Sequence, residues 1–575
     1  MPKPSRIRLL AAPAVVAVSL SFAAALVPTS AHGTTPPDDT PVLLTPKGEI
    51  ADEFHGADET QEGIEKLRDA YYWSRLLSGD SPISVSQAAA LRTNAVKKAG
   101  TLATASPAGA TRGGAWSGQG PSPIVQNGRT SNAFQAVAGR IGALVIRNNG
   151  TIVLGAAQGG VWTYDATSGT WTPRTKATDA HAVGALALAP SNDSIVYMGS
   201  GEGALSGDSY YGDGFYRSAD GGVTWTHVST LFTGQAVSDI VVDPTNAQHV
   251  YASTVRGRGG NHRTTSPSDQ PYGVYESMNG GATWTLRKGT TDELHGATDL
   301  VMDPLNPQVL FASFWGDAIY KSTDGGHTWA TAMTGLPAGN FLEGGTSFSL
   351  GISHPASDAN ATLYTGFDWW DLSNVYHTAR VFKSTDGGAS WAQTGTGTGT
   401  NSIVNYCGTQ CFYDNEVRPD PTNPNTVYAL GSYGYNNSPQ SGGVYRSTDG
   451  GATWRNLGYD LHPDFHAFAY QANDTSHIAI GNDGGIWDSH TGGGRNGSPL
   501  PPLSTADWQD LNGQINPTTG ALVHSTGLAI TQFSSIATVP DVPGQYWGGT
   551  QDNGTLRKSL ANGLGSTRPV ATAVR

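Results

Sequence analysis

One short motif recurs along the chain and limits the possible folds more than any other feature. Close copies of YRSTDGGATW occupy residues 216–225, 275–284, 320–329, 382–391 and 445–454, and degenerate copies occupy 162–171 and 487–494. The copies lie about 40 to 60 residues apart, a spacing typical of proteins built by repeating one small unit. We therefore expect one large array of similar units rather than several unrelated domains.

Each repeat has the composition of a small antiparallel sheet. Upstream of most motifs an apolar segment ends near a proline, turn residues follow, and a second apolar segment begins, as in SDIVVDPTNAQHVYAS at 238–253. A third strand leads into the motif and a fourth begins at its tryptophan. The 75 glycines and 15 tryptophans of the chain fit short strands joined by tight turns. The predicted fold class is all-β, a single β-propeller of four-stranded blades over residues 113–575.

The number of blades follows from the number of units. Seven units fit between residues 140 and 512, and residues 528–559 have the pattern of an eighth start. In one interpretation, residues 113–121 supply the outer strand of that eighth blade and close the ring, which removes the exposed edge of an open array. In the other, the chain stops before the fold would finish. We expect a seven- or eight-bladed propeller and favour ring closure.

The first residues have the pattern of a secretory signal peptide. Lys3, Arg6 and Arg8 precede an apolar run at 9–27, and small residues follow it. We therefore expect a signal peptide at 1–31 and a secreted, extracellular protein. No later segment has the roughly 20 apolar residues of a membrane helix, so no membrane contact is expected after signal removal.

Residues 32–112 differ from the repeats that follow them. Segments 61–77 and 84–99 have helical spacing, and a stretch of small residues comes next. We expect a short helical segment here, followed by a flexible linker.

Charge and cysteine content narrow the possible partners. The formal net charge is -13, and no run of Lys or Arg offsets it, so a nucleic-acid partner is not expected. The two cysteines, Cys407 and Cys411, share one short loop. In an oxidising compartment a disulfide between them is favoured over a metal pair.

The aspartate of the repeated motif is predicted to hold a turn. A Ser and an Asp two residues later precede a glycine pair, which suits a tight hairpin whose backbone amides donate to the two side chains. Ala166 and Asn279 stand at the Asp position in two copies. A catalytic role at every copy would not tolerate that replacement.

The pattern S-x-D-x-G-x-T-W resembles the Asp-box, or BNR, repeat of sialidases, sortilin-type receptors and xyloglucan-active glycoside hydrolases. The resemblance extends over residues 140–560 to secreted bacterial BNR-repeat propellers. It implies a propeller and a protein that acts on or binds glycans. The chain has no RIP motif and no set of three suitably placed arginines, so sialidase activity is not expected.

A functional site is expected on the propeller face opposite the Asp-box turns, where loops converge on the axis. Candidate residues in the loops between second and third strands are Glu202, Asp208, Trp315, Asp368, Trp369, Trp370, Asp371, Asp483 and Asp552. Segments near the starts of inner strands add Asp239, Asp299, Asp414, Glu416, Asp460, His462, Asp464 and His466.

These residues suggest chemistry on sugars. Paired carboxylates can supply the acid and the base or nucleophile of glycoside cleavage, and we assign this role to Asp483 with Asp239, Asp299 or Glu202. Substrate contacts are assigned to Trp369, Trp370, Asp368, Trp315, Asp552 and His466, because tryptophans can stack on sugar rings. Packing within a loop explains the tryptophans equally well.

The resemblance bears on Asp483 in particular. Xyloglucan-active hydrolases of this repeat type place a catalytic Asp in a D-x-G-G-like loop, which Asp483 and, less well, Asp552 match. Those enzymes use a cleft between two propellers, whereas this chain has room for one. The alternative is that Asp483 caps a tight glycine turn. His462, Asp464 and His466 alternate like metal ligands, but Pro463 breaks that geometry, so no metal site is expected.

The sequence therefore predicts a secreted propeller that acts on extracellular polysaccharide, as a glycoside hydrolase with paired carboxylates and no cofactor. The alternatives are a non-catalytic propeller that binds a glycoconjugate or a protein partner, as sortilin-type receptors do, and an assembly scaffold. Fold analogy cannot separate these functions.

Overall fold

The computed structural model describes these parts of the chain: residues 94, 121–125, 136–176, 179, 181–204, 209–256, 270–290, 296–341, 345–395, 403, 405–433, 442–457, 461–494, 507–516, 522–538, 546–551, 553–558 and 565–567. The predicted signal peptide lies outside the described residues. Of the predicted helical segment and linker, only residue 94 is described, and it is helical. No helix among the described residues is both long and apolar enough to cross a membrane.

The described part of residues 121–567 is built from β-strands, which confirms the all-β prediction. Most strands belong to four-stranded antiparallel groups in chain order. The first three groups are β3 (Ile141–Ile146), β4 (Ile152–Ala156), β5 (Gly160–Asp165) and β6 (Thr170–Pro173); β7 (Val183–Ala189), β8 (Asn192–Gly201), β9 (Tyr211–Ser218) and β10 (Thr226–Ser229); β11 (Gln235–Val242), β12 (Val250–Arg256), β13 (Tyr272–Ser277) and β14 (Thr285–Thr290).

The remaining four-stranded groups follow the same order. They are β15 (Ala297–Met302), β16 (Leu310–Phe314), β17 (Ile319–Ser322) and β18 (Ala330–Thr331); β19 (Ser349–Ser353), β20 (Thr362–Trp370), β21 (Tyr376–Ser384) and β22 (Ala392–Gln393); β23 (Asn415–Asp420), β24 (Asn423–Tyr433), β25 (Gly442–Ser447) and β26 (Arg455–Asn456); β27 (Phe465–Gln471), β28 (Asp474–Asn482), β29 (Gly485–Ser489) and β30 (Gln509–Asp510).

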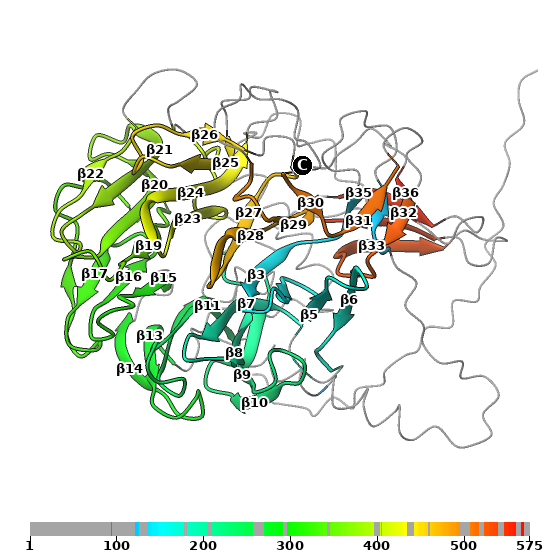
Figure 1. Ribbon diagram of the computed structural model, residues 1–575, viewed down its shortest axis with the longest axis horizontal. Helices are drawn as coiled ribbons and strands as arrows, with labels where there is room; N and C mark the ends of the chain where they lie inside the picture. Colours follow the sequence, from blue (N-terminus) through cyan, green and yellow to red (C-terminus); the bar gives the residue numbers. More distant parts are fainter. Residues whose placement is uncertain are drawn as a thin grey trace, which may run out of the picture. The chain divides into compact units, whose positions relative to one another are not determined.

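The first strands of these groups surround a common centre (Figure 1). Strands β3, β7, β11, β15, β19, β23 and β27 contact one another in that order, and β27 contacts β3. The last contact is a parallel pair between Gln471 and Ile146, which merges the first and last groups into one eight-stranded sheet. A closed cycle of inner strands is the arrangement of a β-propeller.

The predicted eighth unit forms a different structure. Strands β33 (Phe533–Thr538), β34 (Tyr546–Thr550), β35 (Gly554–Lys558) and β36 (Gly565–Thr567) join β1 (Ile124–Val125) and β2 (Ala136–Val137) in a separate six-stranded sheet. Val125 of β1 pairs with Ser566 of β36, whereas of the predicted closing segment 113–121 only residue 121 is described. Because β27 pairs directly with β3, this sheet does not lie between them. Strands β31 (Gly513–Ile515) and β32 (Leu522–Ser525) form a small hairpin.

The Asp-box motifs form the predicted turns. In the copy at 320–329, Asp324 accepts hydrogen bonds from the Thr328 amide at 2.9 Å and from its hydroxyl at 2.6 Å. Ser322 donates to Asp324 at 2.8 Å and accepts from the amide of Gly326, whose φ is +82°. Asn279 accepts from the corresponding amide of its own copy at 2.9 Å. The prediction that the carboxylate holds its own turn is confirmed.

The hydrophobic core lies in the seams between neighbouring sheets. The motif tryptophan Trp284, which precedes β14, packs against the rings of Phe215 at 4.8 Å and Phe232 at 5.1 Å, which belong to the preceding unit. Trp391 bridges a seam in the same way by donating its ring N–H to the Ala332 carbonyl at 2.8 Å. The motif therefore turns the chain and also joins adjacent sheets.

Candidate functional site

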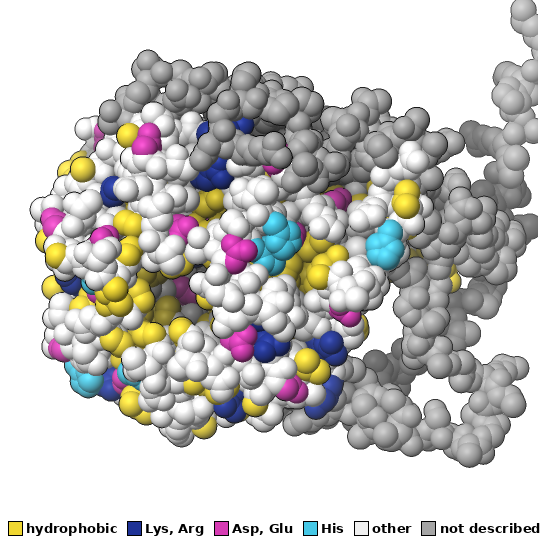
Figure 2. All heavy atoms as spheres, in the orientation of Figure 1, with side chains coloured by type: hydrophobic (Ala, Val, Ile, Leu, Met, Phe, Trp, Pro, Cys, Tyr) yellow, Lys and Arg dark blue, Asp and Glu magenta, His cyan; other side chains and the backbone are white. Residues whose placement is uncertain are grey.

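The inner strands enclose a polar cavity. Its volume is about 150 Å³, and residues of β3, β7, β11, β15, β19, β23 and β27 line it. Its ionisable lining residues are Asp239, Asp299, Glu416, Arg418 and His466. On the face seen in Figure 2, acidic and basic side chains are spread over the described residues without forming one large patch. The cavity therefore brings together two of the predicted catalytic residues, Asp239 and Asp299, and the predicted substrate contact His466.

Asp239 and Asp299 occupy equivalent positions in neighbouring units. The strand register shifts immediately before each of them, and such bulges change the direction of the side chains. Asp239 accepts from the amide of Ile240 at 2.7 Å and from that of Leu300, in the next sheet, at 3.1 Å. Asp299 accepts from Leu300 at 2.9 Å and from Leu350, one sheet further, at 2.8 Å. Each carboxylate therefore ties two inner strands together at the cavity wall.

Arg418 concentrates charge at the cavity. Its guanidinium lies 3.2 Å from the Asp299 carboxylate and 2.8 Å from that of Glu416. Burial disfavours the cation, but the nearby carboxylates of Glu416, Asp299 and Asp239 outweigh it and raise the Arg418 pKa. The site thus holds one permanent cation among three carboxylates.

Two cavity carboxylates bind their protons unusually tightly. Burial, and then the charge of Asp299, holds the pKa of Asp239 well above its usual range. Burial also raises the pKa of Glu416 to about 7, although Arg418 opposes this shift. A carboxylic acid with a pKa near neutrality can donate a proton at the pH where a neighbouring carboxylate is charged. The cavity therefore contains the elements of acid–base chemistry.

Asp483 belongs to a buried ion-pair cluster beside the cavity. Arg140 donates to it at 2.7 Å, Tyr413 donates to its second oxygen at 2.9 Å, and His466 lies 2.9 Å away. Arg140 also forms an ion pair with Glu202. The side chains of Arg140, Glu202 and Asp483 are 3, 2 and 2% exposed. The structure thus brings two further predicted catalytic residues, Glu202 and Asp483, to the same buried arginine. They do not line an open groove.

Asp483 lies in the turn between β28 and β29. The turn amide of Gly484 donates to the side chain of Asn482 at 2.9 Å. The Asp483 carboxylate points away from this turn, toward Arg140, Tyr413 and His466. The local turn is thus held by its neighbour, and Asp483 makes contacts between distant parts of the chain.

The acidic residues near His462 do not gather around one point. Asp464 has a φ of +64° and accepts from Gln410 at 3.2 Å. His462 faces the carbonyl of Pro463 at 3.1 Å. Asp414 is fully buried, and burial followed by the charge of Asp464 raises its pKa well above the usual range. Within the part of the chain that the structure describes, the side chains grouped closely enough to share an ion are other sets.

The two adjacent tryptophans of β20 have different surroundings. Trp369 is buried and stacks on His377 with ring centroids 4.8 Å apart. Trp370 is 40% exposed and lies beside Tyr376, with centroids 5.5 Å apart. Leu372 and Val375, at the tip of the same β20–β21 hairpin, are 69% and 53% exposed. Of the two tryptophans, only Trp370 presents a surface to a ligand from outside.

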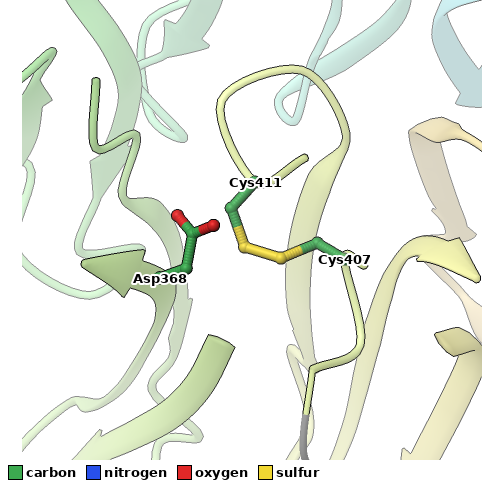
Figure 3. Close-up of side chains that lie close together, drawn as sticks. All are labelled: Asp368, Cys407 and Cys411. Atoms are coloured by element: carbon green, nitrogen blue, oxygen red, sulfur yellow. A yellow bond between two sulfur atoms is a disulfide. The ribbon is translucent and has the colours of Figure 1, made fainter. Parts of the chain in front are cut away.

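Asp368 lies beside the disulfide of the chain (Figure 3). Cys407 and Cys411 form that disulfide, as predicted. Asp368 is buried, accepts from the Tyr376 hydroxyl at 2.8 Å, and has its pKa raised to about 6 by burial. Because the sulfurs are bonded to each other, this group does not offer thiolate ligands for a metal.

The remaining predicted substrate contacts are Trp315 and Asp552. Trp315 is buried, and its ring meets Phe412 edge-on at 6.5 Å. Asp552 lies outside the described residues, as do Asp208 and Asp460. The roles assigned to these residues stay predictions.

Three residues of the site, Arg140, Tyr413 and Arg418, were not among the candidates predicted from the sequence. A signal exists for the arginines: Arg140 interrupts the apolar run AVAGRIGALVI, and Arg418 follows Glu416 in EVRPD. A lone arginine in a core strand needs a buried carboxylate partner. Tyr413 has no comparable signal, because tyrosine is common at many kinds of position.

Comparisons with known proteins relate the chain to enzymes that act on xyloglucan. No protein-family model matches it. A probable oligoxyloglucan-reducing end-specific xyloglucanase of Neosartorya fischeri is 28% identical over 257 residues, which cover 43% of this chain and 27% of that protein. A xyloglucanase of Hypocrea jecorina is 23% identical, covering 51% and 37%. A xyloglucanase of a Paenibacillus species is 25% identical, covering 55% and 31%. The chain thus matches about a third of the length of these curated relatives.

One of two similar solved structures supports the fold. An ancestral GH74 enzyme has a TM-score of 0.51 and 17% identity, with 76% of this chain and 55% of that chain covered. The GH74 enzyme of Niastella koreensis has a TM-score of 0.49 and 19% identity, with 75% and 60% covered. At this identity the likeness to the ancestral enzyme speaks for the propeller fold alone.

Proposed function

We propose that this protein is a secreted glycoside hydrolase on a single seven-bladed propeller and that it acts on extracellular polysaccharide of the xyloglucan type. The observation that carries the proposal is the similarity to proteins named as xyloglucanases over 43–55% of this chain. The cycle of inner strands that closes from β27 to β3 supports seven blades.

The central cavity is the best supported place for catalysis. Glu416, with a pKa of about 7, is proposed as the proton donor, and Asp299, ion-paired with Arg418 at 3.2 Å, as the charged carboxylate. Asp239 assists by holding a second proton nearby. This assignment keeps Asp239 and Asp299 among the candidates and moves Asp483 and Glu202 to positioning roles, because both form ion pairs with the buried Arg140. His466 connects the two groups, since it lines the cavity and contacts Asp483.

The small size of the cavity supports action at a chain end. About 150 Å³ is below the roughly 300–1,000 Å³ of typical small-molecule pockets, so the cavity fits one terminal sugar better than an internal stretch of glycan. Trp370, on the exposed hairpin tip, is proposed to stack on a more distant sugar ring.

The test is hydrolysis of xyloglucan by the purified chain, measured as released reducing ends and, in parallel, as loss of viscosity. Reducing ends should accumulate without an early fall in viscosity. Glu416→Gln should lower kcat by about 10²–10⁴-fold, the usual contribution of a general acid. Asp324→Asn, in an Asp-box turn, is the matched control and should keep full activity. Activity of Glu416→Gln equal to that of the wild type would remove the cavity from the proposal.

A second candidate function is glycan binding without cleavage. It is favoured by the contacts of Arg140, which forms ion pairs with two of the predicted catalytic carboxylates. In that case the wild type releases no product from any glycan but is retarded in a native gel that contains xyloglucan. Trp370→Ala should weaken the retardation while the fold, checked by circular dichroism, stays intact.

The proposed secretion has its own test. The chain should be exported from a bacterial host, and N-terminal sequencing of the exported protein should begin at His32. Retention of the apolar segment 9–27 in the mature protein would contradict the proposed signal peptide.

A further inference from the structure

Two histidines and an aspartate lie together away from the central cavity. His477 of β28, Asp488 of β29 and His490, just beyond β29, offer ligand atoms that all lie within 4.8 Å of one another. His477 and Asp488 are buried, whereas the His490 side chain is 65% exposed. The group forms part of the wall of a cavity of about 660 Å³ that is lined by residues of the first, second and last four-stranded groups.

Gln471 determines which ring nitrogen of His477 carries a proton. The side-chain amide nitrogen of Gln471 donates to the Asn148 carbonyl at 3.1 Å and to the Asn473 side chain at 2.6 Å. This orients the amide, so that the atom facing His477 Nδ1 at 2.6 Å is its oxygen. His477 must therefore carry a proton on Nδ1.

This arrangement leaves the other nitrogen of His477 facing negative charge. In neutral imidazole with a proton on Nδ1, Nε2 presents a lone pair. That atom lies 2.8 Å from one oxygen of Asp488, and His490 Nε2 lies 3.2 Å from the other. A lone pair and a carboxylate oxygen at that distance repel each other unless a proton or a metal ion lies between them. The ligand atoms of Asp488 and His490, within 4.8 Å of that of His477, are what a metal ion would need in addition.

We propose that His477, Asp488 and His490 bind a divalent transition-metal ion, with Zn²⁺ as the best fit to two imidazoles and one carboxylate. The Nδ1–H of His477 donating to Gln471 is the type of support that orients metal-binding histidines. Three protein ligands beside an open cavity leave a further coordination position for water or a small anion. The proposal does not depend on the proposed hydrolase activity.

The position of the cluster connects metal binding to ring closure. Gln471 is the residue of β27 that pairs with Ile146 of β3. Its amide and that of Asn473 both donate to the carbonyl of Asn148, just after β3. A metal that fixes His477 therefore also fixes the residue that joins the last sheet to the first. Metal should stabilise the folded protein, because the unfolded chain does not hold the three ligands together.

The test uses the full chain without a polyhistidine tag, stripped with chelator and titrated with Zn²⁺ and with Co²⁺. One ion per chain should bind, and Co²⁺ should give visible absorption bands of a histidine-containing site. At a free Zn²⁺ concentration about 100 times Kd, the melting temperature should rise by about 3 °C. His490→Ala, at an exposed position, should abolish binding and the rise, whereas His327→Ala, an exposed histidine in a distant Asp-box turn, should leave both unchanged.

Gln471→Leu separates a metal site from a simple ion pair. This substitution removes the hydrogen bond that fixes the tautomer of His477, so Zn²⁺ binding should weaken by about 10–100-fold. At saturating Co²⁺ the absorption spectrum should be the same as that of the wild type. Stoichiometric binding that is the same in the wild type and in His490→Ala would overturn the proposal. A wild-type protein that binds neither Zn²⁺ nor Co²⁺ would also overturn the proposal. The cluster would then be an ion pair between a protonated histidine and Asp488.

Discussion

Arg140 donates to the Asp483 carboxylate at 2.7 Å although 343 residues separate them in the chain. Arg140 comes just before β3, Asp483 follows β28, and Glu202, the second carboxylate on the same guanidinium, follows β8. One buried cation thus connects the first, second and last four-stranded groups beside the central cavity. The contact is made between units and holds the cycle together at its inner wall.

Removing that cation should destabilise the protein severely. Arg140→Met takes the guanidinium away from the buried carboxylates of Asp483 and Glu202, and breaking a buried ion pair in this way costs about 3–5 kcal/mol. Urea unfolding at pH 7 would measure the loss. The double variant Arg140→Met/Asp483→Asn should recover part of it, and a single variant within about 1 kcal/mol of wild type, on the scale of ordinary surface substitutions, would contradict the structural role.

The raised pKa of Glu416 should appear in the pH dependence of stability. Its folded pKa of about 7 lies above the ordinary value of 4.5, so the folded state holds a proton that the unfolded state has released between these pH values. Its contribution to stability is therefore largest at low pH and falls as pH rises from about 4.5 to about 7.

Glu416→Gln should flatten this part of the profile. The slope of unfolding free energy against pH between about 5 and 7 should change by up to about 1.4 kcal/mol per pH unit, the equivalent of one proton. Asp386→Asn, at an exposed Asp-box acid whose pKa is lowered to about 2 by hydrogen bonds from Ser390, is the control and should leave the slope in this window as it is. An unchanged slope in Glu416→Gln would mean that Glu416 titrates normally in the folded protein.

The Asp-box turns should show the opposite pH dependence: their contribution to stability should decrease as the pH falls. Hydrogen bonds from the Thr328 hydroxyl and amide lower the pKa of Asp324 to about 2, below its ordinary 3.8. The stability gained from the charged turn is present above about pH 3.8 and is lost as pH falls toward about 2. Asp324→Asn should remove this acid dependence yet fold at neutral pH, since Asn279 holds the same turn in another copy. Thermal melts from acid to neutral pH would test it, with Asp324→Ala expected to melt lower throughout.

The neighbouring tryptophans of β20 should respond to truncation in opposite ways. Trp369→Ala empties a buried site and should cost about 3–5 kcal/mol of unfolding free energy. Trp370→Ala should leave stability nearly unchanged but weaken glycan binding by about 2–10-fold, the value of one aromatic contact. Calorimetric titration with xyloglucan oligosaccharides would measure the second effect, and equal affinity of Trp370→Ala would exclude the hairpin tip from the binding surface.

Local features of the fold were predictable from the sequence for a physical reason. The Asp-box turn is specified by residues within four positions of one another, so the spacing of Ser, Asp, Gly and Thr is enough to assign their roles. The four-stranded groups followed from the spacing of those turns. The disulfide was also predictable, because only two cysteines exist and they share one loop.

Contacts across the cycle could not be predicted in the same way. The partner of Asp483 lies 343 residues away, and nothing near residue 483 indicates that Arg140 will face it. Strand periodicity places one of Trp369 and Trp370 inside but does not say which. The metal-ligand geometry of His477, Asp488 and His490 arises only once β28 and β29 pair. The sequence also could not show whether β33–β36 join the cycle, because the pairing of β27 with β3 depends on contacts between distant residues.

The parallel pair between Gln471 and Ile146 also has a consequence for biosynthesis. The ribosome must make more than three hundred residues after β3 before its partner strand exists. Until β27 has been made, the edge of β3 that pairs with it has no partner strand. Contacts between residues so far apart in the sequence also form slowly. Cells that make this protein should therefore need a chaperone that shields the waiting strand during translation or export.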